Sequence, residues 1–241
     1  MNVLIVLSLT LVAIAGTVVV TAQDPARQAV TLPDGASFEL GASLGVPAMT
    51  AHYCLFADGP VAGKTVLVAG GAGAVGHFAI ELAARAGATV IATVSSEEKA
   101  ELARQAGAAC VVNYRDPDAA AQIKAVAPQV DRVVEVALGT NLGLDLSLAG
   151  PGTVIVAYAA EAQDPVLPVR ACMTANVVLR FILLYGVPAA ALGQAAADIS
   201  AAMADGALSE LPAHHFPLSD IAAAHRAAES GITGKVFVTI P

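Results

Sequence analysis

Residues 65–76 read TVLVAGGAGAVG, and this stretch decides the fold. Its first five residues are apolar or β-branched, which is typical of a strand that is buried on both faces. Residues 74–86 (AVGHFAIELAARA) then have helical spacing and composition. In the turn between them, Gly71, Gly73 and Gly76 fit the pattern G-x-G-x-x-G in the strand–turn–helix context that this motif requires.

Each glycine of this pattern has a physical role in binding a dinucleotide. One glycine allows the tight turn, the second leaves room for a pyrophosphate beside the backbone, and the third lets the helix pack closely on the strand. The free N–H groups at the helix start, together with the helix dipole, then bind phosphate oxygens. The chain contains 21 glycines, so we weigh this interpretation against a turn that is purely structural.

Strands and helices alternate after this first unit. A regular alternation predicts a parallel sheet with helices on both faces. Right-handed crossovers then make it a doubly wound α/β domain of the Rossmann type. The expected strands are 89–94, 110–113, 131–136, 153–158 and 177–184, and the expected helices are 96–106, 117–127, 138–148 and 188–203.

The flanking segments differ from this core. Residues 39–56 (ELGASLGVPAMTAHYCLF) have helical composition, and we expect a break near Gly45–Pro47. The tail consists of an extended segment (211–217), a helix (218–230) and a last strand (235–240). We therefore divide the chain into an N-terminus and loop (1–40), a nucleotide-binding domain (41–210) and a C-terminal tail (211–241).

The apolar N-terminal stretch, residues 1–22, allows three interpretations. It is a signal peptide or membrane anchor, a set of strands left over from a truncated upstream domain, or a start without structure. No Lys or Arg precedes the apolar run, and residues 3–20 are short for a membrane-spanning helix.

Charge and cysteine content exclude several classes of function. The chain carries 20 acidic and 12 basic residues, a net charge of −8 without a basic cluster, which argues against nucleic-acid binding. Cys54, Cys110 and Cys172 are odd in number and far apart in sequence. This pattern favours reduced thiols in a cytoplasmic protein over disulfides or a metal site.

The residues at the end of the second expected strand indicate which cofactor binds. A Rossmann domain that binds NAD usually has Asp or Glu there, but this chain has Ser95. Lys99 follows within one helical turn, and a cation beside hydroxyl groups at a helix N-terminus favours the 2′-phosphate of NADPH. Glu97 and Glu98 weaken this interpretation, and the alternative for Lys99 is a solvated lysine paired along the helix.

Three quoted stretches, in this order, carry a resemblance to a known family. They are LPDGASFELGASLGVPAMTAHYCLF (32–56), GKTVLVAGGAGAVGHFAIELAARAGATVIATVSSEEKAELARQAGA (63–108) and FPLSDIAAAHRAAESGITGKVFVTIP (216–241). Two shorter matching stretches, VVNYRD (111–116) and NLGLDLSL (141–148), lie between the second and the last. From about residue 32 onward the chain resembles the quinone oxidoreductase, or zeta-crystallin-like, branch of the medium-chain dehydrogenases/reductases. The resemblance implies a zinc-independent NADPH-dependent reductase of a small quinone or enone. It also implies a homodimer that forms through the strand 177–184.

The resemblance further implies roles for individual residues. Gly231 departs from the family pattern, because some relatives have a basic residue at this position that faces the 2′-phosphate of the cofactor. The implied cofactor contacts are Thr50 and Val156 to Tyr158 beside the nicotinamide, the backbone of Gly73, Ala74 and Val75 at the pyrophosphate, and Ser95, Lys99 and Tyr114 at the 2′-phosphate.

No residue of the sequence is an evident general acid, so the catalytic residues stay unassigned. His52, Tyr53 and Tyr158 are candidates by location only. Relatives carry a catalytic domain before the nucleotide-binding domain, so the alternative function is a non-catalytic NADPH-binding fragment or pseudoenzyme. A membrane-anchored NADPH-binding protein is a further alternative. A short-chain dehydrogenase is disfavoured because no Tyr has Lys four residues later.

Overall fold

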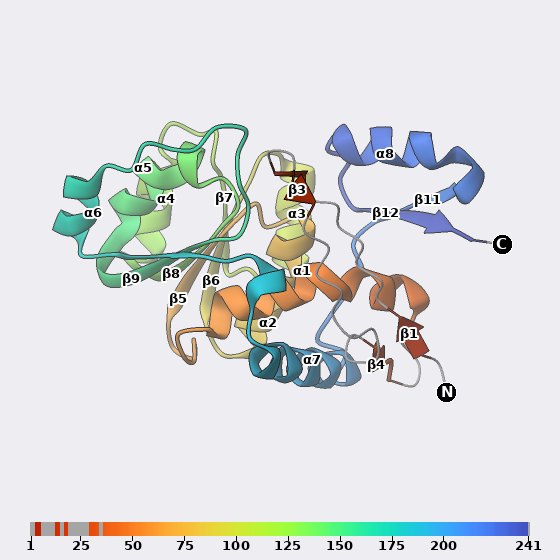
Figure 1. Ribbon diagram of the computed structural model, residues 1–241. Helices are drawn as coiled ribbons and strands as arrows, with labels where there is room; N and C mark the ends of the chain where they lie inside the picture. The colour runs from red at the N-terminus through yellow and green to blue at the C-terminus, as the bar shows by residue number, and fades with distance from the viewer. Residues whose placement is uncertain (1–2, 6–12, 15–16, 19–28, 34–35, 241) are drawn as a thin grey trace.

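A six-stranded parallel sheet forms the centre of the molecule, as seen in the computed structural model (Figure 1), which describes residues 3–5, 13–14, 17–18, 29–33 and 36–240. Its strand order is β10-β9-β8-β5-β6-β7, so the chain starts in the middle and winds outward in both directions. This topology confirms the doubly wound α/β prediction. The strands are β5 (Thr65–Ala69), β6 (Thr89–Val94), β7 (Cys110–Asn113), β8 (Val130–Glu135), β9 (Ala149–Ala157) and β10 (Val178–Phe181).

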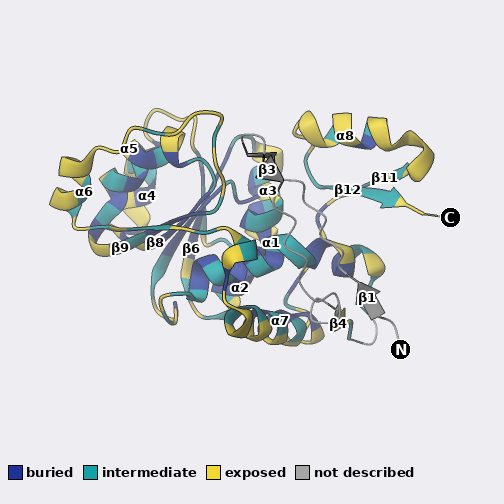
Figure 2. Cartoon of the chain, in the orientation of Figure 1, coloured by how far each residue is buried: buried dark blue, intermediate teal, exposed yellow. Residues whose placement is uncertain are grey.

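Helices cover both faces of the sheet and bury one hydrophobic cluster on each. The first cluster joins the sheet to α1 (Phe38–Phe56), α2 (Ala74–Arg85), α3 (Glu97–Gln105) and α7 (Ala189–Ala204). The second cluster joins it to α4 (Ala119–Val126) and α5 (Leu138–Leu148). The central strands β5, β6 and β8 are accordingly the most buried part of the molecule in Figure 2, as expected for apolar runs between two helical layers.

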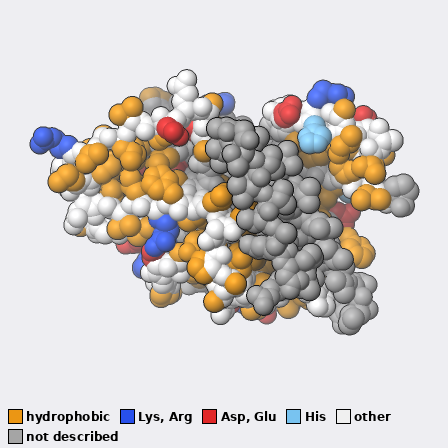
Figure 3. Space-filling model, in the orientation of Figure 1, with side chains coloured by type: hydrophobic (Ala, Val, Ile, Leu, Met, Phe, Trp, Pro, Cys, Tyr) orange, Lys and Arg blue, Asp and Glu red, His pale blue; other side chains and the backbone are white. Residues whose placement is uncertain are grey.

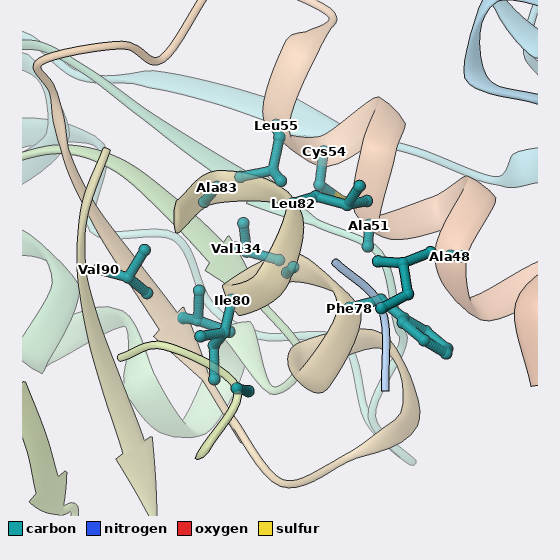
Figure 4. Close-up of a cluster of buried hydrophobic side chains, with 14 of the residues drawn as sticks. Ala48, Ala51, Cys54, Leu55, Phe78, Ile80, Leu82, Ala83, Val90 and Val134 are labelled. Carbon is teal, nitrogen blue, oxygen red and sulfur yellow. The ribbon is translucent and has the colours of Figure 1, made fainter. Parts of the chain in front are cut away.

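The predicted break near Gly45–Pro47 is wrong, because helix α1 runs through Pro47 without interruption. Ser37 caps its start, where the hydroxyl accepts a hydrogen bond from the backbone N–H of Leu40 (2.9 Å). Ala48 and Ala51 are fully buried and lie against α2 beside Phe78 (Figure 4). Burial of this apolar face outweighs the backbone hydrogen bond that a proline inside a helix removes.

Strand β9 begins at Ala149, four residues earlier than expected, although Gly150–Gly152 is a turn-like sequence. Ala149 pairs with Val130, and an irregular register between Val130 and Arg132 accommodates the turn residues. The hydroxyl of Thr153 accepts a hydrogen bond from the N–H of Gly150 (2.9 Å) and donates one to the carbonyl oxygen of Val130 (2.6 Å). β10 is shorter than expected, and α6 (Val169–Ala175), a helix that the sequence did not predict, precedes it.

The C-terminal tail folds as a separate strand–helix–strand unit beside the sheet (Figure 1). β11 (Ala213–Pro217) and β12 (Lys235–Thr239) pair in parallel, and a 3-10 turn (Leu218–Asp220) followed by α8 (Ile221–Glu229) connects them. Most of α8 is exposed in Figure 2.

Short strands form in the N-terminal stretch. β1 (Val3–Ile5) pairs with β4 (Ala29–Thr31), and β2 (Ala13–Ile14) pairs with β3 (Thr17–Val18). The three interpretations of residues 1–22 concern a stretch that lies mostly outside the described residues. Among the described helices, none is both long enough and apolar enough to cross a bilayer.

Candidate functional site

The turn between β5 and α2 is closed tightly onto the sheet. Gly70 has a φ of +70°, and the N–H of Gly71 donates to the carbonyl oxygen of Thr93 on β6 (2.9 Å). A Cβ added at Gly76 would lie 2.2 Å from the carbonyl oxygen of Gly70, and one at Gly71 would lie 2.9 Å from the Cβ of Ala92. Both positions therefore require glycine for close packing. The left-handed residue is Gly70, which lies outside the quoted motif.

The start of α2 is open to an anion. Its N-cap residue, Gly73, is exposed, and no side chain makes a capping hydrogen bond there. The first turn contains no acidic residue. The backbone N–H groups of Ala74, Val75 and Gly76 belong to the first helical turn, where intrahelical partners are lacking. These groups and the helix dipole fit a pyrophosphate at the turn.

The structure brings together the three residues expected at a 2′-phosphate. Ser95 follows β6, and Ser96 caps α3 by accepting a hydrogen bond from the backbone N–H of Lys99 (3.4 Å). On the neighbouring strand, the N–H of Tyr114 donates to the carbonyl oxygen of Val94 (3.0 Å), which extends the sheet by one residue. The side chains of Ser95, Lys99 and Tyr114 are therefore attached to adjacent segments at the carboxyl ends of β6 and β7.

The negative charge that weakened the interpretation of Lys99 is partly neutralised. Arg104 lies about one and a half helical turns after Lys99 on α3. It forms ion pairs with Glu97 (2.7 Å) and Glu101 (3.4 Å). Glu98 is exposed and forms no ion pair with another described residue. Lys99 likewise has no ion-pair partner within the described part of the chain.

Arg115 is a neighbour of this site that the sequence analysis missed. Its Nη1 donates to the carbonyl oxygen of Ser95 (3.4 Å), and its guanidinium carbon lies 5.7 Å from the centre of the Tyr114 ring. The available signal was its position directly after Tyr114, where a strand end leads into a loop.

The other end of the candidate site lies at the carboxyl end of β9. Tyr158 is half-buried there, and its N–H donates to the carbonyl oxygen of Glu135 (3.1 Å). Burial, with the nearby Cys54 and Glu135, raises the pKa of Tyr158 well above its usual value. Thr50 is buried on α1 one helical turn before Cys54, so α1 presents Thr50 and Cys54 on the same face.

The thiol of Cys54 and the phenol of Tyr158 cannot act as bases at neutral pH. Burial raises the pKa of Cys54 to about 12, although Arg132 nearby lowers it in part. The thiol of Cys54 and the phenol of Tyr158 therefore stay protonated, so Tyr158 can donate a hydrogen bond but does not ionise near pH 7. The arrangement suits the positioning of a ligand.

His52, one of the candidates by location, has a structural role. Its Nε2 lies 2.8 Å from a carboxylate oxygen of Asp198 on α7, and its ring lies 4.7 Å from that of Phe56. It therefore joins α1 to α7. Tyr53 is half-buried on α1 and lies close enough to Arg180 to raise the pKa of that side chain, after the larger effect of Asp58.

Two buried carboxyl groups, one of them on the residue that Tyr158 bonds through its backbone, lie at this end of the sheet. Glu135 accepts hydrogen bonds from the N–H of Ala137 and from Nδ2 of Asn141 (2.9 Å), so it fixes the start of α5. Burial and the adjacent Glu135 raise the pKa of Asp145 to about 8. One oxygen of each carboxyl group lacks a hydrogen-bond partner among the described residues. We expect the pair to hold one proton at neutral pH, since the charge of one carboxylate disfavours ionisation of the other.

The described residues contain no group of three or more His, Cys, Asp or Glu side chains that could hold a metal ion.

A half-buried cation near α2, Lys235, was also missed by the sequence analysis. Its Nζ lies 5.4 Å from the centre of the Phe78 ring, and burial lowers its pKa to about 8.

The fold, the closed glycine turn and the open helix start define a nucleotide-binding Rossmann domain. The family described as "Zinc-binding dehydrogenase" matches residues 74–201. The chain belongs to this family, within the quinone oxidoreductase branch of the medium-chain dehydrogenases/reductases, which confirms the resemblance drawn from the sequence.

Several relatives place the chain in that branch. Human quinone oxidoreductase is 30% identical over 214 residues, which cover 87% of this chain and 65% of the human protein. The 2-haloacrylate reductase of a Burkholderia species is 32% identical over 198 residues, covering 77% of this chain and 58% of that protein. This chain thus spans less than two thirds of the length of both relatives.

A solved structure shows the same fold. The crystal structure of Escherichia coli quinone oxidoreductase complexed with NADPH has a TM-score of 0.79 and 25% identity. The match covers 90% of this chain and 69% of the bacterial one.

Proposed function

We propose that this chain is an NADPH-dependent oxidoreductase that transfers a hydride to a quinone or an α,β-unsaturated carbonyl without zinc. The observation that carries the proposal is the turn at Gly70–Gly76, where backbone contacts exclude side chains and α2 starts without a cap. Similarity to proteins named quinone oxidoreductase and 2-haloacrylate reductase supports the reaction class. Similarity to a quinone oxidoreductase complexed with NADPH supports the cofactor.

In this proposal the chain binds the cofactor through three groups of residues. The backbone of Gly73, Ala74 and Val75 binds the pyrophosphate, with Gly71 and Gly76 closing the turn. Ser95, Lys99 and Tyr114 bind the 2′-phosphate. Thr50 and the segment Val156 to Tyr158 line the nicotinamide half.

The bound cofactor supplies the hydride, and the residues of this chain position it. Tyr158 stays neutral and can donate a hydrogen bond, while Glu135 fixes the start of α5 beside it. The buried face of α1 closes this end of the site and excludes water from around Thr50. In this proposal the substrate is a small quinone or enone that meets the nicotinamide beside Thr50 and Tyr158.

Replacement of Lys99 tests the cofactor. We expect wild-type protein to bind NADPH at least tenfold more tightly than NADH, and Lys99→Ala to lose most of that preference, because a charge-assisted hydrogen bond contributes about 1.5–3 kcal/mol. Isothermal titration calorimetry measures both affinities. The matched control is Lys124→Ala, an exposed lysine on α4 at the other face of the sheet.

Equal affinities for the two nucleotides in wild-type protein would contradict the NADPH assignment. Oxidation of NADPH in the presence of a simple naphthoquinone then tests turnover. Tight NADPH binding without turnover would favour the second candidate function, a non-catalytic NADPH-binding protein. Turnover that persists after dialysis against a chelator is expected for a reaction without zinc.

We also propose that two copies of the chain pair through the edge strand β10. Val178 and Phe181 are exposed there, with 64% of Phe181 accessible, and Leu183 follows. Hydrophobic side chains also gather over the end of the molecule that carries α6 (Figure 3). An exposed apolar edge strand is a template for pairing with another chain.

Replacement of Phe181 tests this pairing. We expect Phe181→Lys to shift the protein from dimer to monomer in sedimentation equilibrium, since a lysine on an edge strand opposes pairing. Met173→Lys, on the exposed face of α6, is the control for added charge. A monomeric wild-type protein would exclude the dimer.

The division of the chain into residues 1–40, 41–210 and 211–241 is likewise a proposal. Limited proteolysis tests it, because cleavage is expected first near the boundaries between these segments.

A further inference from the structure

We propose that Arg115 is a specificity residue that reads the 2′-phosphate of the cofactor together with Lys99. This inference rests on the proposed function and adds a residue to its site. The side chain of Arg115 returns from the loop after β7 to the end of β6, where its Nη1 donates to the carbonyl oxygen of Ser95 (3.4 Å).

The backbone holds Arg115 in this position. Val94 and Asn113 are register partners on β6 and β7, and the N–H of Tyr114 continues the ladder to the carbonyl oxygen of Val94. The side chain of Asn113 then accepts a hydrogen bond from the N–H of Arg115 (3.0 Å). The residue therefore leaves the sheet at a defined place, next to Ser95.

The ring of Tyr114 supports the guanidinium group, which lies 5.7 Å from its centre. An arginine that is stacked on an aromatic face loses less conformational freedom when it binds a ligand. The planar fork of N–H donors matches the oxygens of a phosphate. The contact with Ser95 engages Nη1, and no other hydrogen bond to a described residue engages the remaining nitrogens.

Within the part of the chain that the structure describes, the acidic side chains next to Arg115 do not engage its guanidinium group in an ion pair. In the loop, Asp116 and Asp118 follow it, but neither forms an ion pair with it among the described residues. On α3, Arg104 pairs with Glu97. Lys99 and Arg115 are the two cations attached to the carboxyl ends of β6 and β7, with Ser95 between them in the fold. A dianionic phosphate fits between two such cations.

The test compares nucleotides that differ only by this phosphate. We expect Arg115→Gln to weaken NADPH and 2′,5′-ADP binding about tenfold and to change NADH and 5′-AMP binding by less than twofold. Arg115→Lys should restore part of the loss, because it keeps the charge and loses the planar fork. Arg170→Gln is the matched control, an exposed arginine on α6. Titration calorimetry measures all of these affinities.

Two results would overturn the inference. Unchanged NADPH affinity in Arg115→Gln excludes a phosphate contact, and an equal loss for NADPH and NADH assigns Arg115 to the adenosine instead. Failure of the proposed function is a separate observation, because wild-type protein would then bind neither nucleotide. Circular dichroism of Arg115→Gln shows whether the variant is folded.

Discussion

Asp58→Asn is expected to destabilise the protein by about 3 kcal/mol, because it removes the counter-charge of a buried arginine. Arg132 on β8 is 2% exposed, and its Nη2 bonds Asp58 (3.1 Å) while its Nη1 bonds the carbonyl oxygen of Cys54 (2.6 Å). Asp58 also pairs with Arg180 on β10, and the side chain of Asp58 is only 23% exposed. One carboxylate therefore links the end of α1 to two strands.

Thermal unfolding measures this effect. A loss of 3 kcal/mol corresponds to a midpoint about 6–12 °C lower for a protein of this size. Arg132→Met should cost less than Asp58→Asn, since it removes the buried charge together with its need for a partner. The control is Asp205→Asn, which breaks the exposed pair with Arg85 and should change stability by less than about 1 kcal/mol. Equal effects for Asp58→Asn and Asp205→Asn would show that the pairing of Asp58 with buried Arg132 contributes no more to stability than an exposed ion pair.

Asp145→Asn is expected to stabilise the protein above pH 7 and to flatten its dependence of stability on pH. Asp145 is 1% exposed and Glu135 is fully buried. Burial and then Glu135 raise the pKa of Asp145 from 3.8 to about 8 in the folded state. The folded protein therefore holds a proton that the unfolded chain releases above about pH 4.

The sign of the effect follows from this difference. A carboxyl group with a raised pKa in the folded state contributes its full stability below its unfolded pKa and loses it as pH rises through the folded pKa. Wild-type stability should thus fall by roughly 1 kcal/mol per pH unit between about pH 5 and pH 7 because of this pair. The two arginines beside Asp58 outweigh its burial and lower its pKa, so that group acts in the opposite direction, and its contribution is lost at acid pH.

Urea unfolding from pH 5 to pH 9 tests the pair. The amide of Asn at position 145 keeps the shape and donates a permanent hydrogen bond to Glu135, so the slope should disappear. Asp164→Asn, an exposed carboxyl group in the loop after β9, is the control and should leave the slope unchanged. A wild-type slope that persists in Asp145→Asn would show that the two carboxyl groups do not share a proton.

Much of the fold was predictable from local patterns. The strand 65–69 and the helices starting at Ala74 and Leu138 form with the expected first residues, because apolar strand runs, glycine turns and helical periodicity act over a few residues. The continuity of α1 through Pro47 was not predictable in this way. Its contacts with α2 and α7 come from residues distant in sequence, and they outweigh a local helix breaker.

The candidate site shows the same division. Gly71, Gly73 and Gly76 indicated a dinucleotide turn, since their spacing is itself the chemical requirement. Arg115 stands in the quoted stretch VVNYRD but received no role there, because its relation to Ser95 depends on the pairing of β6 with β7. Glu135 and Asp145 are ten positions apart, and only packing of α5 on β8 brings the two carboxyl groups together.

By itself, the sequence determined that this protein is a doubly wound α/β chain with a glycine turn suited to a dinucleotide, because periodicity and turn chemistry are local properties. The tertiary structure decided which charges are partnered. It buries Arg132 beside Asp58, places Asp145 against Glu135 and leaves Lys99 and Arg115 without ion pairs among the described residues. Burial and distance between segments far apart in the chain set these electrostatic properties, and no local pattern encodes them.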